Sequence, residues 1–200
     1  QGTTGSGKTL VYFERIKKIL EEKKQALVLL PEIFLTNEFK SRFEDFFGFE
    51  PAIWHSKITP KQKRIIWNGI LNNRIRLVIG ARSALLLPFK KLGIIIVDEE
   101  HDASYKQDEG VIYNARDMAI SRASFEKIPI HLITSVPSIE TYNNIQNKKY
   151  RHVKILNRFK NYPLPKTKII NLNIGKLKDR FVSEETIDLV KHFLKRKEQV

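Results

Sequence analysis

The chain has 200 residues, 42% of them hydrophobic, and a formal net charge of +14. This length is enough for one substantial core and part of a second. No apolar run approaches the roughly 18–20 residues of a membrane span, and no cysteine is present to form a disulfide or a thiolate zinc site. These features argue against a membrane protein and a disulfide scaffold, and we expect a cytoplasmic protein.

The positive charge is concentrated near the end of the chain. Residues 148–200 hold 15 Lys and Arg against 5 Asp and Glu, whereas residues 1–147 hold 21 against 17. A basic segment favours a polyanionic partner, because Lys and Arg that neutralise phosphates release condensed counterions. A general coding bias toward Lys, Ile and Asn explains the total charge equally well, so the composition alone leaves the partner open.

Short apolar runs alternate with longer amphipathic stretches along the first 134 residues. Strands covered by helices on both faces become continuous apolar runs, so this alternation predicts a three-layer α/β fold with a mainly parallel sheet. Thr36 and Thr59-Pro60 are suitable starts for two of the helices. The predicted elements are a helix over Thr9–Glu22, a strand over Gln25–Leu30, a helix over Thr36–Phe46, a strand over Pro51–Trp54, a helix over Pro60–Leu71, strands over Arg76–Ile79 and Gly93–Val97, a helix over Asn114–Phe125, and a strand over Pro129–Thr134.

The pattern loosens after Tyr150, where Pro163 and Pro165 favour an extended segment. An amphipathic helix is predicted from Ser183 to about Lys197, with acidic residues in its first turn and basic residues in its last. We therefore predict a first domain over residues 1–155, a linker over 156–181, and the beginning of a second domain, including its first helix, over 182–200.

The first residues match the phosphate-loop pattern G-x-x-x-x-G-K-[ST] and precede a predicted helix. Glycines permit a tight loop whose backbone N–H groups surround phosphates at a helix N-terminus. Lys8 is expected to reach the β- and γ-phosphates of ATP, and Thr9 to bind Mg²⁺. The alternative is a chance glycine-rich turn. A strand should precede the loop but only Gln1 does, so we expect the chain to be truncated there. The predicted nucleotide-binding residues are Gly2, Thr3, Thr4, Gly5, Ser6, Gly7, Lys8 and Thr9.

An acidic motif follows the apolar run Ile94–Val97. A strand that ends in acids places Asp98 at the carboxyl edge of the sheet, where open α/β sheets bind ligands. We expect Asp98 to contact Mg²⁺ and Glu99 to act as the general base. A solvated turn or a helix cap is the alternative, but the motif comes about three βα units after a phosphate loop, which favours catalysis.

The sequence Asp98-Glu99-Glu100-His101 resembles the DEAH/DEEH motif of superfamily 2 helicases. Its continuation to Gln107 and the segment from Tyr113 to Asp117 resemble the primosomal replication-restart helicases in particular. Further segments match that family in order over nearly the whole chain: Leu30–Thr36, Trp54–Ser56 and Ile79–Leu85. The resemblance implies a RecA-like P-loop NTPase domain.

Loops after successive parallel strands emerge at the same sheet edge as the nucleotide, where they can contact a DNA backbone. The resemblance implies that this surface binds single-stranded DNA, although a structural ion pair is an alternative for Arg82. Aromatic and cationic residues also alternate after the acidic motif, a combination that can stack on bases and contact phosphates, with packing at the sheet edge as the alternative. The predicted DNA-binding residues are Pro31, Glu32, Thr36, His55, Ser56, Gly80, Arg82, Ser83, Tyr105, Lys106, Tyr113 and Arg116.

Two further features concern the coupling of hydrolysis to movement. We expect His101 to bridge toward the next strand's motif and sense the nucleotide, with capping of its turn as the alternative. In the segment Thr134–Ser138 this chain has Thr-Ser-Val-Pro-Ser where the family usually has Ser-Ala-Thr-Pro-Ser. Because this segment couples hydrolysis to strand separation in related motors, the departure puts unwinding in more doubt than ATP binding.

The resemblance implies an ATP- and Mg²⁺-dependent DNA helicase of the replication-restart primosome that moves 3′ to 5′ and unwinds stalled forks. Its expected partners are single-stranded and forked DNA, other primosome proteins and single-strand-binding protein. Zinc is expected only in a further C-terminal part. Arginines of a second motor domain complete such sites, so we expect these 200 residues alone to hydrolyse little ATP. A superfamily 2 translocase on duplex DNA and a non-catalytic, nucleotide-responsive DNA-binding module remain alternatives.

Overall fold

A computed structural model describes residues 1–158, 160, 167–171, 177–179 and 182–198. The chain divides into two compact units, Gln1–Tyr162 and Pro163–Val200. Much of the predicted linker, including Pro163 and Pro165, lies outside the described residues, so the predicted domain limits stay a prediction.

The first unit is built on a parallel sheet of five strands in the order β2-β3-β1-β4-β7. Each central strand is fully buried because helices cover both of its faces. The predicted α/β fold with a mainly parallel sheet is confirmed, and every predicted strand is present. The bounds are β1 (Gln25–Leu29), β2 (Ala52–Trp54), β3 (Leu77–Gly80), β4 (Leu92–Val97) and β7 (Ile130–Leu132).

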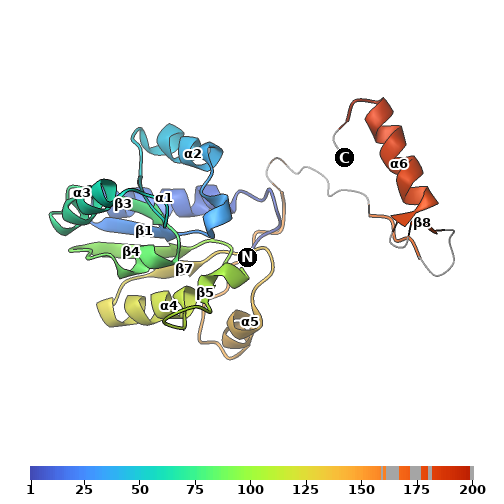
Figure 1. The fold of residues 1–200 in the computed structure, drawn as a ribbon. Helices are drawn as coiled ribbons and strands as arrows, with labels where there is room; N and C mark the ends of the chain where they lie inside the picture. The colour runs from blue at the N-terminus through green and yellow to red at the C-terminus, as the bar shows by residue number, and fades with distance from the viewer. Residues whose placement is uncertain (159, 161–166, 172–176, 180–181, 199–200) are drawn as a thin grey trace. The chain divides into compact units, whose positions relative to one another are not determined.

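Helices lie on both sides of this sheet (Figure 1). Helices α1 (Lys8–Glu21) and α2 (Asn37–Phe47) pack on one face through a cluster that includes Phe13 and Phe43. Helices α3 (Pro60–Leu71) and α4 (Ala115–Glu126) contribute to the cluster on the other face. The alternation of side chains along β1 decides this division: Ala26 and Val28 face the first cluster, and Leu27 and Leu29 face the second.

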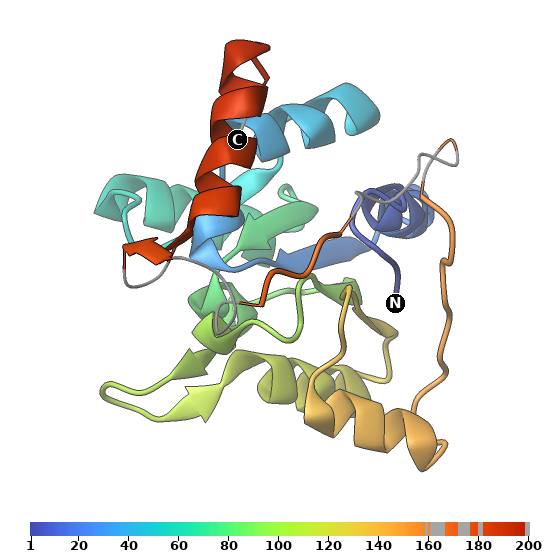
Figure 2. The same cartoon turned by 90° about the vertical axis from the view of Figure 1, so that its right-hand side faces the viewer.

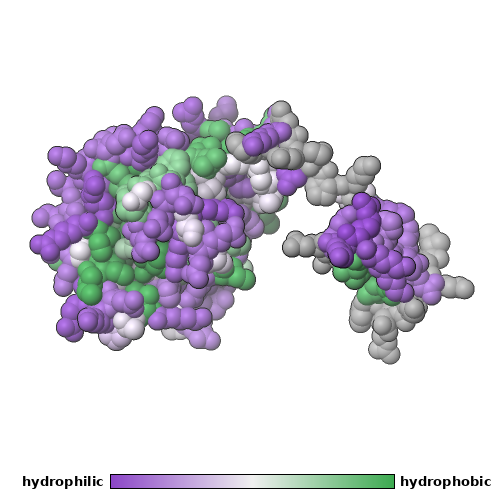
Figure 3. Space-filling view, turned by 90° about the horizontal axis from the view of Figure 1, so that it is seen from above, coloured by the Kyte–Doolittle hydropathy of each residue, from purple (hydrophilic) through white to green (hydrophobic). Residues whose placement is uncertain are grey.

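Local sequence signals set the helix ends. The Thr36 hydroxyl accepts a hydrogen bond from the Phe39 N–H at 3.2 Å, and Thr59 forms a capping box with Gln62 before Pro60. Both predicted starts are confirmed. The surface seen from above in Figure 3, over α1 and α2, is mainly hydrophilic with scattered apolar patches, as expected for the outer side of amphipathic helices.

Several smaller elements were not predicted. Helix α5 (Ile139–Gln146) follows the segment 134–138 and is capped by Ser138. Two short strands, β5 (Lys106–Gln107) and β6 (Tyr113–Asn114), form an antiparallel hairpin that projects from the α4 side of the unit (Figure 2). The 3-10 helices are η1 (Glu32–Phe34), η2 (Arg82–Leu86) and η3 (Ala103–Tyr105).

The second unit contains the antiparallel strands β8 (Leu177–Asp179) and β9 (Val182–Ser183) and the helix α6 (Glu184–Lys195). Ser183 caps α6, as its hydroxyl accepts a hydrogen bond from the Thr186 N–H at 3.2 Å. The predicted helix is therefore present, and its first turn carries Glu184 and Glu185. In neither unit does a described helix have the length and apolar character needed to cross a bilayer.

Candidate nucleotide-binding site and DNA-facing edge

The phosphate loop joins the sheet to the start of α1. The N–H of Gly2 donates to the carbonyl of Thr134 at 3.1 Å, and Gly2 also pairs with Ile155 in a parallel bridge. A Cβ atom on Gly2 would lie 2.5 Å from the Ser6 hydroxyl, so any side chain here would force the Ser6 side chain to move. Gly7, with φ of 81°, ends the loop in the left-handed region that favours glycine.

Polar side chains of the loop lie close to its backbone. Lys8 Nζ donates to the carbonyl oxygens of Gly2 at 2.8 Å and Thr3 at 3.3 Å. Among the described residues, the buried hydroxyls of Thr3 and Ser6 have no hydrogen-bond partner. Buried polar groups are usually satisfied, so unpartnered hydroxyls in this loop fit a ligand rich in acceptors, such as a polyphosphate.

Asp98 follows directly after β4 and is only 7% exposed. Its carboxylate accepts hydrogen bonds from the Tyr12 hydroxyl and from the N–H of Glu99, both at 3.0 Å. Burial raises the pKa of Asp98 to about 6, and the hydrogen bond from Tyr12 opposes this shift. The carboxylate is therefore held in a fixed orientation in a site that penalises its negative charge.

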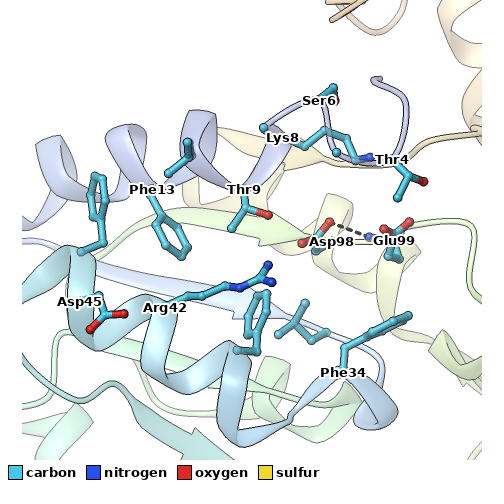
Figure 4. Close-up of a pocket in the computed structure, with 16 residues that line it drawn as sticks. Thr4, Ser6, Lys8, Thr9, Phe13, Phe34, Arg42, Asp45, Asp98 and Glu99 are labelled. Atoms are coloured by element: carbon cyan, nitrogen blue, oxygen red, sulfur yellow. Dashed lines mark hydrogen bonds between the residues drawn. The ribbon is translucent and has the colours of Figure 1, made fainter. Parts of the chain in front are cut away.

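The phosphate loop and the acidic motif line one cavity of about 680 Å³. Figure 4 shows Thr9, Asp98 and Glu99 around the same space, with Lys8 extending toward Thr4. The sequence predicted that these two motifs would face each other, and the geometry brings them together. The other wall of the cavity comes from η1 and α2 and was not predicted. The residues of this wall are Phe34, Phe39, Arg42, Asp45 and Phe46.

A signal for this wall was present in the sequence. Phe39, Arg42 and Phe46 are spaced three and four residues apart, which puts them on one face of the predicted helix. Arg42 extends from α2 toward Thr9 (Figure 4) and is held by Glu38 through an ion pair of 2.6 Å. The spacing predicted only a helix and no functional side chain after Thr36, so the cation at its centre was missed.

The donor set suits a magnesium ion that is shared with a ligand. Among the described residues no group of three or more His, Asp or Glu side chains could hold a metal ion. Mg²⁺ commonly keeps several waters and binds through one or two protein groups plus phosphates. Thr9 and Asp98, which line the same cavity, are the residues that would hold it there.

His101 contacts the segment after β7. Its Nδ1 atom lies 2.7 Å from the Thr134 hydroxyl, which itself donates to the carbonyl of Val136 at 2.7 Å. The same nitrogen lies 3.7 Å from the Glu99 carboxylate. Glu99 has a φ of 47°, a strained value for a non-glycine residue. His101 thus bridges from the acidic motif to the next strand's motif, and sensing the nucleotide remains a prediction.

Glu100 was not predicted as a functional residue, yet it is the most buried acid of the motif, at 1% exposure. Its carboxylate accepts hydrogen bonds from the N–H and hydroxyl of Ser138, from the Thr141 hydroxyl and from Arg116. An acidic residue that directly follows the two predicted catalytic acids was the available signal. Its partners lie far along the chain, so the sequence could not identify them.

The loops predicted to face DNA are linked at the carboxyl edge of the sheet. The Ser56 hydroxyl donates to Glu32 at 2.8 Å, and the Trp54 indole donates to the Ser83 hydroxyl at 3.1 Å. Arg82 donates to the carbonyl of Lys106 at 2.7 Å, and it forms no ion pair with the part of the chain that the structure describes. Each loop therefore contacts a neighbour, and Glu32, Thr36, Ser56, Ser83 and Lys106 are exposed there.

The remaining predicted residues of this edge differ in exposure. His55 and Tyr113 are partly exposed, whereas Pro31 and Gly80 are buried. A Cβ atom on Gly80 would lie 2.5 Å from the carbonyl oxygen of Trp54. Pro31 and Gly80 thus shape the loops and do not offer side chains to a ligand.

Tyr105 and Arg116 require a correction, because both are buried, at 1% and 6% exposure. The Tyr105 hydroxyl donates to the carbonyls of Leu29 at 2.9 Å and Asp98 at 2.6 Å. Arg116 forms ion pairs with Glu100 at 3.3 Å and Asp117 at 2.8 Å. Neither side chain is available to stack on a base or contact a phosphate, so the packing alternative holds for both.

The parallel sheet, the phosphate loop and the acidic motif are together typical of the nucleotide-binding domains of helicases. The sequence model of the DEAD/DEAH box helicase family matches residues 1–156, and the chain belongs to this family. Among curated proteins it is similar to replication restart protein PriA of Rickettsia conorii, with 50% identity over 100% of this chain and 31% of that protein. It is also 40% identical to replication restart protein PriA of Bacillus subtilis, over 86% of this chain and 21% of that protein.

Two solved structures share the fold. RecG bound to a three-way DNA junction matches 78% of this chain and 20% of its own, with a TM-score of 0.54 and 23% identity. The DUF1998 helicase MrfA bound to DNA and AMPPNP matches 98% of this chain and 30% of its own, with a TM-score of 0.57 and 17% identity. The chain spans about a third or less of the length of the curated relatives described above.

Proposed function

We propose that this chain is the first ATP-binding motor domain of a DNA helicase that acts in replication restart. The observation that carries the proposal is the single cavity lined by Lys8, Thr9, Asp98 and Glu99. A triphosphate on the loop would meet the acids on the opposite side of the same space. The similarity to replication restart protein PriA over the whole chain supports the biological role.

In this proposal the loop binds and orients the phosphates. The N–H groups at the start of α1 and the ammonium of Lys8 are the donors, and Thr3 and Ser6 add hydroxyls that are otherwise unpartnered. Lys8 would exchange its bonds to the Gly2 and Thr3 carbonyls for bonds to the β- and γ-phosphates. In this proposal Lys8 turns toward the phosphates, and the buried Thr3 and Ser6 hydroxyls become accessible when the ligand binds.

Thr9 and Asp98 would hold Mg²⁺, which supplies charge neutralisation at the phosphates. Glu99 is the proposed general base, because it lies beside Asp98 at the cavity and has 30% of its side chain exposed. His101 would transmit nucleotide-dependent changes of this site to Thr134 through the contact between its Nδ1 atom and the Thr134 hydroxyl. Arginines of a second motor domain would complete the charge stabilisation.

Single-stranded DNA is the proposed ligand of the linked loops at the carboxyl edge, with Glu32, Thr36, His55, Ser56, Arg82, Ser83, Lys106 and Tyr113 as the contacting residues. Support comes from the exposed hydroxyls and cation at this edge and from the resemblance of the segments that carry them. We further propose translocation from 3′ to 5′, unwinding of forks, and interaction with other primosome proteins and single-strand-binding protein.

The test compares two variants of the full-length gene product. Lys8→Ala should weaken ATP binding, whereas Glu99→Gln should keep ATP affinity and reduce kcat by at least about a hundredfold, the usual contribution of a general base. ATP affinity is measured by titration and turnover by phosphate release with DNA present. If both variants hydrolyse ATP at the rate of the unmodified protein, this site is not the ATPase site and the proposal fails. Absence of hydrolysis in the unmodified protein would instead support a non-catalytic, nucleotide-responsive module.

The rival enzyme class is a translocase on duplex DNA. The altered segment Thr134–Ser138 is the observation that favours it, because this segment couples hydrolysis to strand separation in related motors. A strand-displacement assay on a forked substrate distinguishes the two. ATP-dependent displacement supports the helicase, and DNA-stimulated hydrolysis without displacement supports the translocase.

A further inference from the structure

The carboxylate of Glu100 is the centre of a buried polar cluster. Its Oε1 atom accepts from the Ser138 N–H at 2.8 Å, and its Oε2 atom accepts from the Ser138 and Thr141 hydroxyls at 2.9 and 3.0 Å. Arg116 Nη1 donates to Oε2 at 3.3 Å and to the Ser138 hydroxyl at 2.7 Å. The side chain of Glu100 is 0% exposed and that of Arg116 is 7% exposed.

Burying a charged pair is costly unless its geometry is well satisfied. Replacing a buried ion pair with hydrophobic side chains of similar volume is often neutral or stabilising, so stability alone gives little reason for a carboxylate here. The four donors come from three places: Arg116 at the start of α4, Ser138 at the cap of α5, and Thr141 in its first turn. Glu100 therefore links the turn after β4 to two helices through directional bonds.

These bonds hold one end of the segment 134–138, and His101 holds the other. His101 lies 2.7 Å from the Thr134 hydroxyl, and the N–H of Glu100 donates to the carbonyl of Ile133 at 3.0 Å. Between the two ends, Val136 is 66% exposed. Two consecutive residues of the acidic motif thus clamp both ends of the segment, and any shift of the turn after β4 moves both ends together.

We propose that Glu100 is a positioning residue that couples the nucleotide site to the segment 134–138 and to α5. The inference rests on the proposed ATPase function and deepens it. When Asp98 and Glu99 adjust to a bound nucleotide, Glu100 moves with them, because all three lie in one short turn. Ser138 and Thr141 move with Glu100, because a buried carboxylate that loses its hydrogen-bond donors is energetically costly.

Thr141→Val is the most specific perturbation. It keeps the volume and β-branching of the side chain, leaves the Ser138 cap intact and removes one of the four donors to Glu100. Thr141→Ser restores the hydroxyl and serves as the rescue. Gln146→Ala, an exposed change on the same helix, is the matched control for α5.

The measurements are ATP hydrolysis with and without single-stranded DNA in the full-length gene product, and amide hydrogen exchange over residues 134–146 with and without ATP and Mg²⁺. For Thr141→Val we expect about a tenfold lower DNA-stimulated kcat, from losing one hydrogen bond to a charged group. The KM for ATP should stay within about twofold, since no group that contacts the nucleotide changes. The ATP-dependent change in exchange should also shrink, and Thr141→Ser and Gln146→Ala should behave like the unmodified protein.

Equal loss of kcat with and without DNA would overturn the proposal, because it would show a general defect and no loss of coupling. Unchanged DNA stimulation in Thr141→Val would also overturn it, while leaving the ATPase proposal intact. If the unmodified protein shows no DNA-stimulated hydrolysis, the proposed function itself fails and the coupling role of Glu100 fails with it.

Discussion

Replacing Asp98 with asparagine should stabilise the nucleotide-free chain in a pH-dependent way. Burial raises the pKa of Asp98 from 3.8 to about 6, so the folded state holds this proton more tightly than the unfolded state. The free energy of unfolding therefore falls as pH rises from about 4 to 6, and above this window the charged carboxylate costs about 3 kcal/mol. Near pH 4.5 the same cost is only about 1 kcal/mol, since Asp98 is protonated in most of the folded molecules.

An asparagine side chain at this position has no charge to bury, so Asp98→Asn should gain about 2 kcal/mol more at pH 8 than at pH 4.5. The asparagine amide keeps one oxygen that accepts from the Glu99 N–H. Any stability lost through a weaker hydrogen bond from Tyr12 is the same in the variant at both pH values, so it cancels in the comparison. Urea unfolding of the 200-residue chain at the two pH values measures the difference. Asp108→Asn, at a carboxylate that is 71% exposed, controls for the loss of a negative charge.

An equal gain at both pH values would refute the reasoning, because the benefit would then come from packing or hydrogen bonding. In the presence of ATP and Mg²⁺, the unmodified chain should become more stable than the Asp98→Asn variant above pH 6. A ligand that binds only the folded state stabilises it in proportion to the logarithm of its concentration over Kd. Asp98 is a proposed metal ligand, so the Asp98→Asn variant should gain less from the nucleotide than the unmodified chain.

Further predictions concern Tyr105, Lys106 and the second unit. Tyr105→Phe should cost about 1–2 kcal/mol of stability, because the hydroxyl is hydrogen-bonded to two buried carbonyls. Urea unfolding measures this cost. A drop in DNA affinity without a loss of stability would contradict the burial of Tyr105. Lys106→Ala should lower the dependence of DNA affinity on salt by about 0.7 in the logarithmic slope for single strands, and an unchanged slope would remove Lys106 from the proposed DNA edge. Deleting residues 163–200 should also reduce this slope, because they form the second unit and hold nine Lys and Arg against five Asp and Glu. An equal slope in a salt titration by fluorescence anisotropy would exclude that unit from DNA binding.

The sequence alone determined the elements that depend on local pattern. The short apolar runs at residues 25–30 and 93–97 are typical of buried strands, because their continuous hydrophobicity requires cover on both faces. The glycines before Lys8 predicted the tight loop, since neighbouring residues and backbone sterics fix its shape. Thr36 and Thr59 predicted helix starts for the same reason: a cap bonds to a backbone group three residues away.

Only the tertiary structure decided which polar side chains face a ligand and which stay inside. Tyr105, Lys106 and Arg116 look alike as candidates in the sequence, but the turn after β4 buries Tyr105 beneath Asp98 and leaves Lys106 exposed. Glu100 became important through Ser138 and Thr141, which lie 38 and 41 residues away. A residue type states which bonds a side chain can make, whereas the choice of partner depends on long-range packing, which leaves no local periodic trace.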